Sequence, residues 1–116
     1  MEREKLGKQI LEVLKKHLPL EDCIVILYGS LALGEETPTS DIDLLIDCLN
    51  PIGDWEFLEL QEALNTEIDT PRKVNPVEMK TLSEDFLHFA LQGAVIQYVG
   101  KNYLRRWLNR WNVHRD

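Results

Sequence analysis

Two short apolar runs on either side of a polar loop constrain the fold more than any other feature of this chain. The first run is CIVILY, at residues 23–28, and the second lies in DIDLLID, at residues 41–47. Both are rich in aliphatic side chains and too short for buried helices, so both are predicted to be strands. Gly29 and Ser30 follow the first run, and ten residues separate them from Asp41 and Asp43. The sequence therefore predicts a strand, a glycine–serine turn, a loop and a second strand that begins with paired aspartates.

The rest of the chain predicts helices packed on a small sheet. Pro76 lies inside one β-prone run, which predicts an edge strand or a bulge. Asp54 and Ser83 are expected to cap helices at their N-termini. We expect helices over residues 2–18, 55–64 and 83–93, a short turn or helix over 29–34, and further strands over 72–77 and 94–99. The fold class is therefore α+β (α/β), with a small mixed β-sheet flanked by helices.

Charge is spread unevenly along the 116 residues. The net charge is −7, but residues 101–116 carry +4, which leaves −11 on residues 1–100. We expect one domain over residues 1–100, followed by a basic amphipathic helix over residues 101–116. An acidic body disfavours nucleic-acid binding by the domain itself. No window resembles a membrane span, and the charged N-terminus does not resemble a secretory signal, so a cytoplasmic protein is predicted.

The two cysteines carry no metal-binding pattern. Cys23 and Cys48 lie 25 residues apart, and neither has a neighbouring cysteine or histidine at ligand spacing. In a cytoplasmic protein such residues are expected to be reduced thiols, here partly buried.

The paired aspartates carry the chemistry. Side chains two residues apart in a strand share a face, so Asp41 and Asp43 are expected to point the same way, roughly 6–7 Å apart. Two carboxylates at that distance repel by about 2–3 kcal/mol at an effective dielectric constant near 20, and a divalent cation would relieve that repulsion. Mg²⁺ suits two carboxylates together with substrate phosphates, and the Gly29–Ser30 turn offers backbone N–H groups to those phosphates. Asp47 lies on the same face further along the strand and is expected to be solvated. The opposite face, which is expected to be buried, holds Ile42, Leu44 and Ile46.

The stretch GSLALGEETPTSDIDLLID resembles the signature of the DNA polymerase beta-type nucleotidyltransferase superfamily. The short chain is similar to the minimal nucleotidyltransferases (MNT) of that superfamily, which include the MntA-type antitoxins, over about residues 10–99. The resemblance implies that Gly29 and Ser30 bind the phosphates of ATP, and that Asp41 and Asp43 bind Mg²⁺. In the MntA group the acceptor of AMP is a tyrosine of a HEPN-type toxin. The resemblance therefore implies a cytoplasmic antitoxin that acts as a protein adenylyltransferase on such a partner.

The chain departs from the family pattern at the third carboxylate, which members place on the next strand. Asn75 stands at the matching position. An amide can ligate a cation weakly through its oxygen, but it brings no negative charge and cannot act as a general base. Glu78 would face away by strand alternation unless a bulge at Pro76 re-aims it. Glu67 and Asp69 are the other candidate replacements.

A second departure follows the glycine–serine turn, where many members carry basic residues and this chain carries Leu31 and Leu33. Phosphate charge would then be balanced by the metal and the backbone. Together with Asn75, this leaves an alternative function. The chain would be a catalytically degenerate nucleotidyltransferase-fold module that neutralises its partner by occlusion.

The C-terminal segment predicts a helix with one apolar stripe. The stripe residues recur at positions i, i+3, i+4 and i+7, with arginines on the flanks; they are Leu104, Trp107, Leu108 and Trp111. The stripe could pack on the chain's own domain, or it could be displayed to a partner or to a second copy in a homo-oligomer. Contact with nucleic acid or a membrane surface is the third alternative.

Overall fold

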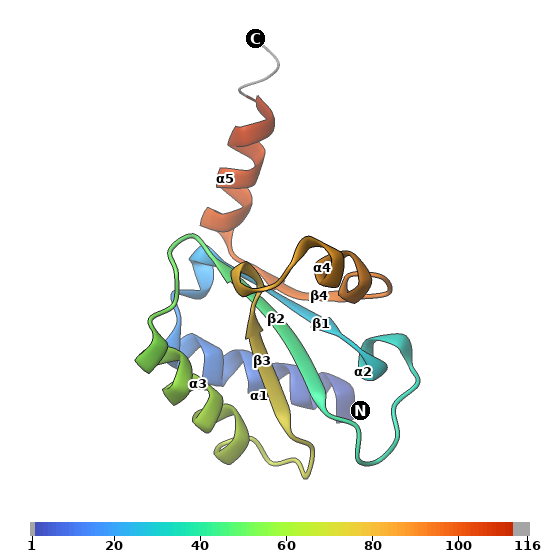
Figure 1. The fold of residues 1–116 in the computed structure, drawn as a ribbon. Coiled ribbons are helices and arrows are strands. Elements are labelled where there is room, and N and C mark those ends of the chain that lie inside the picture. Colours follow the sequence, from blue (N-terminus) through green and yellow to red (C-terminus); the bar gives the residue numbers. More distant parts are fainter. Residues whose placement is uncertain (1, 113–116) are drawn as a thin grey trace.

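The computed structural model describes residues 2–112 and consists of a four-stranded sheet with helices on both faces (Figure 1). The strands lie in the order β3-β2-β1-β4, with β2 and β3 parallel and the other pairs antiparallel. In chain order the elements are α1 (Glu2–His17), η1 (Leu20–Asp22), β1 (Cys23–Tyr28), α2 (Ser30–Leu33), β2 (Ile42–Cys48), α3 (Asp54–Thr66), β3 (Val74–Glu78), η2 (Met79–Thr81), α4 (Glu84–Ala90), β4 (Val95–Val99) and α5 (Lys101–Asn112). The predicted α+β fold with a mixed sheet is confirmed.

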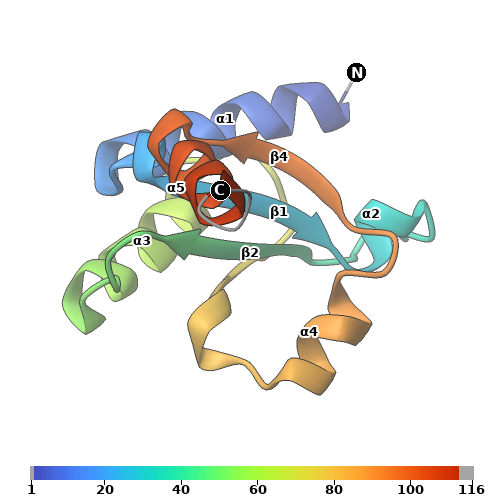
Figure 2. The ribbon, with the colours of Figure 1, turned by 90° about the horizontal axis from the view of Figure 1, so that it is seen from above.

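The sheet separates two apolar cores (Figure 2). The larger core lies between the sheet and helices α1 and α3, and it buries the alternate residues Ile42, Leu44 and Ile46 of β2, as predicted. The smaller core lies under α4 on the opposite face, around Ile26 and Leu45. Burial on both faces explains why β1 is a continuous apolar run rather than an alternating one.

Most predicted elements are confirmed, with boundary shifts. Strand β3 is an edge strand, as Pro76 predicted, although it begins two residues later than expected. Ser83 caps α4 by accepting a hydrogen bond from the Phe86 N–H at 3.2 Å. The predicted cap at Asp54 is wrong, because Gly53 holds the cap position and Asp54 is the first helical residue. There its negative charge still faces the positive end of the helix dipole.

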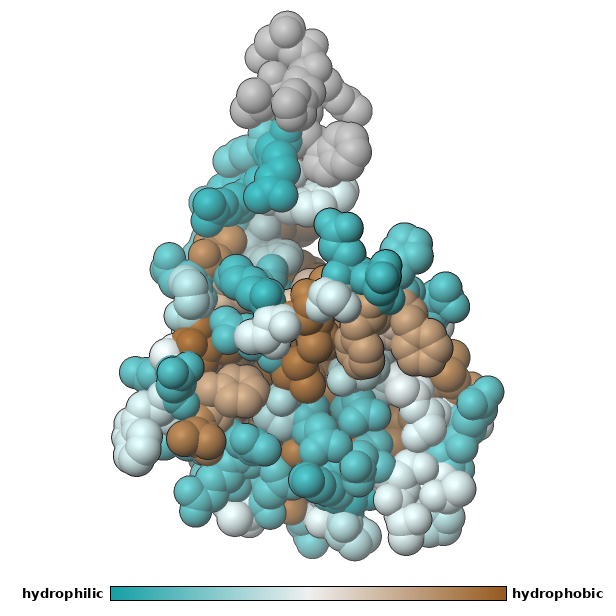
Figure 3. Space-filling view, in the orientation of Figure 1, coloured by the Kyte–Doolittle hydropathy of each residue, from teal (hydrophilic) through white to brown (hydrophobic). Residues whose placement is uncertain are grey.

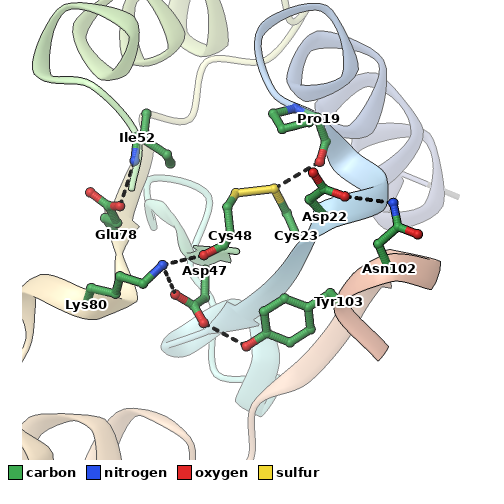
Figure 4. The surroundings of a disulfide bond; sticks show 10 residues. All are labelled: Pro19, Asp22, Cys23, Asp47, Cys48, Ile52, Glu78, Lys80, Asn102 and Tyr103. Atoms are coloured by element: carbon green, nitrogen blue, oxygen red, sulfur yellow. Dashed lines mark hydrogen bonds and ion pairs between the residues drawn. A yellow bond between two sulfur atoms is a disulfide. The ribbon is translucent and has the colours of Figure 1, made fainter. Parts of the chain in front are cut away.

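The prediction of reduced, partly buried cysteines is also wrong. Cys23 and Cys48 are directly opposite in the antiparallel pairing of β1 with β2, and their sulfur atoms are joined in a disulfide (Figure 4). Both residues are almost completely buried. The prediction failed because it considered spacing and compartment, whereas the strand register is what brings the two side chains together.

Asp47, at the end of β2, is not solvated as predicted. Its Oδ2 accepts a hydrogen bond from the Tyr103 hydroxyl at 2.7 Å, and Lys80 Nζ lies 3.3 Å from its Oδ1 (Figure 4). Only 18% of its side chain is exposed. The cation and the hydroxyl come from η2 and α5, whose positions relative to β2 could not be inferred from local sequence.

Helix α5 rises away from the body of the molecule (Figure 1). The exposed fractions of Leu104, Trp107 and Leu108 are 42%, 50% and 46%, so about half of each of these stripe side chains is exposed. The side chain of Trp111 and residues 113–116 lie outside the described part of the chain. Within residues 2–112, no helix is both long and apolar enough to span a bilayer.

Candidate functional site

Three strands bring the predicted site residues together at one end of the sheet. Asp43 on β2 is paired with Tyr28 on one side and with Asn75 of β3 on the other. Asp41 lies immediately before β2, and Gly29 and Ser30 follow β1 directly. Residues far apart in the sequence therefore meet because β1 is antiparallel to β2 and β3 is parallel to it.

A single amide group joins the two aspartates. The Asn75 Nδ2 group donates hydrogen bonds to Asp41 Oδ2 at 3.0 Å and to Asp43 Oδ1 at 3.4 Å. Both carboxylates therefore converge on one point in front of Asn75. Turning the amide over would present its oxygen at that same point, beside two negative charges.

Gly29 is required by its backbone conformation and by the space beside it. Its φ of 79° and ψ of −157° lie in a region that is essentially restricted to glycine. A Cβ atom at this position would lie only 2.5 Å from Asp43 Oδ2. The turn therefore brings the backbone at Gly29 into direct contact with the carboxylate, and Ser30 begins α2 beside it.

Arg72 holds the loop that leads to Asp41. Its Nη1 donates hydrogen bonds to the carbonyl oxygens of Thr37 and Ser40 at 2.8 and 2.9 Å. The Ser40 hydroxyl in turn accepts a hydrogen bond from the Thr37 N–H at 2.8 Å. Sequence reasoning missed this positioning residue, because no local signal pairs an arginine before β3 with a loop 32 to 35 residues earlier.

Electrostatics at the site disfavour the charged form of Asp43. Burial raises the pKa of Asp43, the hydrogen bond from Asn75 lowers it, and the charge of Asp41 raises it, with a net upward shift. Burial and the nearby Asp43 charge also raise the pKa of the Tyr28 hydroxyl. The fold thus holds Asp43 partly away from water and beside the charge of Asp41, which is unfavourable for its carboxylate alone.

The donor set fits a hard divalent cation. Two carboxylates converge on a position now filled by amide hydrogens, and Mg²⁺ is typically held by one or two carboxylates together with substrate phosphates. Among residues 2–112, no cluster of three or more histidine, cysteine, aspartate or glutamate residues could hold a metal. Mg²⁺ bound here would therefore depend on Asp41 and Asp43, with Asn75 as a neutral neighbour.

The proposed replacements for a third carboxylate lie elsewhere. Glu78 is not re-aimed by Pro76, since its Oε2 accepts a hydrogen bond from the Ile52 N–H at 3.0 Å. Glu67 is paired with α1, because its Oε1 lies 3.4 Å from Lys16 Nζ. Asp69 is next to the same helix, with its N–H bonded to Gln9 Oε1 at 3.2 Å.

Apolar side chains surround the polar cluster. Leu31 is buried in the larger core, whereas Leu33 is exposed at the end of α2. On the α4 side, Phe86 contacts the Tyr28 ring edge-on, with ring centroids 6.5 Å apart, and Phe89 lies beside it. Apolar side chains gather over α4 on the face of the molecule that carries this helix (Figure 3). Neither phenylalanine was predicted to lie near the site.

Comparison with known families gives a match over most of the chain. Residues 8–99 match the family model described as "Polymerase beta, Nucleotidyltransferase". Two proteins of Methanocaldococcus jannaschii, each named "Putative protein adenylyltransferase", are similar to this chain. One is 33% identical over 90 residues, covering 70% of this chain and 92% of the relative. The other is 34% identical over 94 residues, covering 69% and 94%.

Solved structures that are similar to this chain include chains from toxin–antitoxin structures. A chain of a toxin–antitoxin structure with AMP-PNP superimposes with a TM-score of 0.69 at 16% identity, covering 92% of this chain and 88% of that one. A chain from a complex of a tri-AMPylated Shewanella oneidensis HEPN toxin with an MNT antitoxin superimposes with a TM-score of 0.65 at 15% identity, covering 97% and 89%. At these identities, the likeness establishes the fold.

Proposed function

Because this chain belongs to the polymerase beta nucleotidyltransferase family and is of the minimal type, we propose that it transfers AMP from ATP to a hydroxyl group of a protein. The observation that carries the proposal is the convergence of Asp41 and Asp43 in front of Asn75, with the backbone of Gly29 against Asp43. Binding of ATP phosphates calls for backbone N–H donors next to a metal-binding carboxylate pair, and the closeness of the Gly29 backbone to Asp43 supports this assignment.

Each residue then has a defined part in binding. The turn at Gly29 and Ser30 would hold the ATP phosphates through backbone N–H groups. Asp41 and Asp43 would hold Mg²⁺, whose positive charge would neutralise the phosphates. The acceptor oxygen attacks the α-phosphorus, the bond to the β-phosphate breaks and diphosphate leaves, while the hydroxyl proton is released to water. Asn75 orients both carboxylates by hydrogen bonding, and Arg72 holds the loop that carries Asp41.

The acceptor in this proposal is a tyrosine of a HEPN-type toxin, so the chain would act as an antitoxin. Support comes from two sources. The Methanocaldococcus jannaschii relatives are named as protein adenylyltransferases, and a structural neighbour is an MNT antitoxin in complex with an AMPylated HEPN toxin.

The experiment is AMP transfer from α-labelled ATP to a co-expressed HEPN-type toxin in the presence of Mg²⁺. We expect labelled toxin with the natural chain and a loss of roughly a thousandfold or more with Asp41→Asn plus Asp43→Asn. Asp54→Asn is the matched control, since it makes the same chemical change at the start of α3. Transfer that survives the double substitution would show that the assigned site is wrong.

A second candidate function is a binding module without turnover. It is favoured by the Asn75 amide, which contacts both carboxylates where family members carry a third carboxylate. Asn75→Asp separates the two candidates, because it adds the missing charge at the point of convergence.

If the natural chain is a weak enzyme, we expect Asn75→Asp to raise AMP transfer about tenfold. If it is a binding module, the natural chain binds the toxin, transfers no AMP and gains transfer only with the substitution. Strong transfer by the natural chain would exclude the binding module. Toxin binding, measured separately by calorimetry, reports on the partner whichever candidate holds.

A further inference from the structure

Helix α5 is held at its base as a rigid projection. The Gly100 N–H donates to the Cys23 carbonyl at 2.7 Å, and a Cβ at this glycine would lie 2.3 Å from the backbone of η1. Asn102 Nδ2 donates to Asp22 Oδ1 at 2.8 Å, and the Tyr103 hydroxyl donates to Asp47 (Figure 4). These contacts fix the first turn of α5 against η1 and β2, and so they set the direction in which the rest of the helix points.

The apolar side of α5 borders one anchoring residue and faces away from another. Tyr103 lies about 40° around the helix axis from Trp107, and both line the same hollow. At 100° per residue, Asn102 lies about 200° around the helix axis from Leu104, whereas Trp107 and Leu108 share the face of Leu104. These three exposed residues, Leu104, Trp107 and Leu108, are here called the arm stripe. Exposed aromatic and aliphatic side chains on a helix face are characteristic of a protein-docking surface.

The arm stripe is continuous with a cationic pocket. A hollow of about 200 Å³ lies between the end of β2, η2 and α5, and Trp107 belongs to both its wall and the stripe. Lys80, Arg106 and Arg110 line the pocket, and Asp47 is its acidic residue. Lys80 is already paired with Asp47, so the two arginines give the pocket its excess positive charge.

Charge decides the kind of partner. Residues 101–112 contain four cationic and no acidic residues, whereas residues 1–100 carry −11. Antiparallel pairing with the α5 of a second copy would bring two such cationic helices together, which is unfavourable. The α5 of a second copy would also bind poorly in the acidic hollow beside α5. Glu21 and Asp22 in that hollow already accept hydrogen bonds from Tyr98 and Asn102. The acidic body likewise repels nucleic acid and anionic lipid.

We propose that α5 is the docking site for an acidic amphipathic helix of the protein acceptor. The apolar face of the partner helix would cover the arm stripe, and one carboxylate of that helix would enter the pocket between Arg106 and Arg110. This inference rests on the proposed function, because it names the surface that holds the acceptor while its hydroxyl is modified at the other end of β2. The nucleotide site itself takes no part in the docking.

The test uses the full chain and two synthetic labelled peptides, without nucleotide or toxin. Both peptides carry leucines at i, i+3, i+4 and i+7, and the remaining positions are glutamate in one and lysine in the other. Binding is followed by fluorescence anisotropy at about 50 and about 300 mM salt, because a charge-assisted complex weakens as screening increases. We expect the acidic peptide to bind at low salt, to weaken at high salt, and to outcompete the lysine peptide at least tenfold.

Matched variants locate the surface. Trp107→Ser plus Leu108→Ser, and separately Arg106→Glu plus Arg110→Glu, should each weaken binding of the acidic peptide at least tenfold. The apolar control is Trp55→Ser plus Leu58→Ser on α3, where both side chains are also exposed. The charge control is Lys5→Glu plus Lys8→Glu on α1, both exposed. Each control should leave binding unchanged, and circular dichroism should be the same for every variant.

The proposal is overturned if the two peptides bind equally, or if the controls weaken binding as much as the α5 variants do. It is also overturned if light scattering shows a dimer that Trp107→Ser dissociates, since a second copy would then cover the stripe. Displacement of the acidic peptide by a 20-nucleotide RNA or by phosphatidylglycerol vesicles would overturn it as well. Asp43→Asn should abolish AMP transfer but not peptide binding, so failure of the docking site and failure of the proposed function give different results.

Discussion

Strand β2 carries an aspartate near each end of the same face, and the two are treated in opposite ways. Asp43 faces Asp41 and accepts a hydrogen bond from the neutral amide of Asn75. Asp47 faces the Lys80 ammonium and the Tyr103 hydroxyl. The fold therefore balances the charge of Asp47 and leaves the charge of Asp43 unbalanced.

This difference distinguishes a structural carboxylate, Asp47, from the one that we propose to be functional, Asp43. A charge whose partners are already present holds elements together, here β2, η2 and α5. A charge held against burial and a like charge is unfavourable until something binds, and such arrangements are concentrated at functional sites. The same residue type on the same strand thus has two different environments, which are set by neighbours that come from distant segments.

The largest expected effect comes from replacing Gly29, which lies against Asp43, and this effect is on the affinity for Mg-ATP. Gly29→Ala places a methyl group within 2.5 Å of Asp43 Oδ2 in a conformation that alanine rarely adopts, so we expect Mg-ATP affinity to fall about a hundredfold, or about 2.7 kcal/mol. Gly34→Ala is the control, since Gly34 also has a positive φ of 73° but no atom within 4 Å of the added methyl. Calorimetric titration of ATP measures both. Equal losses would show that the contact with Asp43 is unimportant.

Neutralising the two aspartates one at a time should change stability in opposite directions. The carboxylate charge of Asp47 pairs with Lys80 and also strengthens the hydrogen bond from Tyr103. Asp47→Asn removes that charge, so we expect a loss of about 1 kcal/mol in the free energy of unfolding. Asp43→Asn removes repulsion with Asp41 while keeping an acceptor for Asn75, so we expect a gain of up to about 1 kcal/mol without metal. Urea unfolding in EDTA measures both. A loss of stability in both variants would remove the distinction between the two ends of β2.

The smallest expected effect is a pH dependence. The folded-state pKa of Asp43 is raised above the value of 3.8 that is typical of an exposed aspartate. The folded chain therefore holds this proton more tightly, so the contribution of Asp43 is most favourable below pH 3.8 and is lost as pH rises through the folded pKa. The stability of the natural chain relative to Asp43→Asn should fall over that interval. A constant difference between the two unfolding curves would contradict the raised pKa.

Local sequence predicted most of the elements and the residues at the candidate site. The apolar runs, the glycine–serine turn and Pro76 were sufficient because each acts through its immediate neighbours in the chain. Apart from the helix cap expected at Asp54, the failures involve residues that the tertiary fold brings together. The disulfide follows from the register of β1 with β2, the state of Asp47 from η2 and α5, and the role of Arg72 from the position of β3 beside the loop. Such contacts depend on topology, which single residues do not encode.

An uninterrupted strand between the two aspartates also sets a length. Asp43 and Asp47 are four residues apart on β2, which corresponds to about 13 Å. A protein seated on α5 would offer a hydroxyl to the nucleotide only if that hydroxyl lay about this far from its docked helix. In that arrangement the length of β2 would determine which residue is modified. The residue would be selected by its distance from the docking helix rather than by the sequence around it.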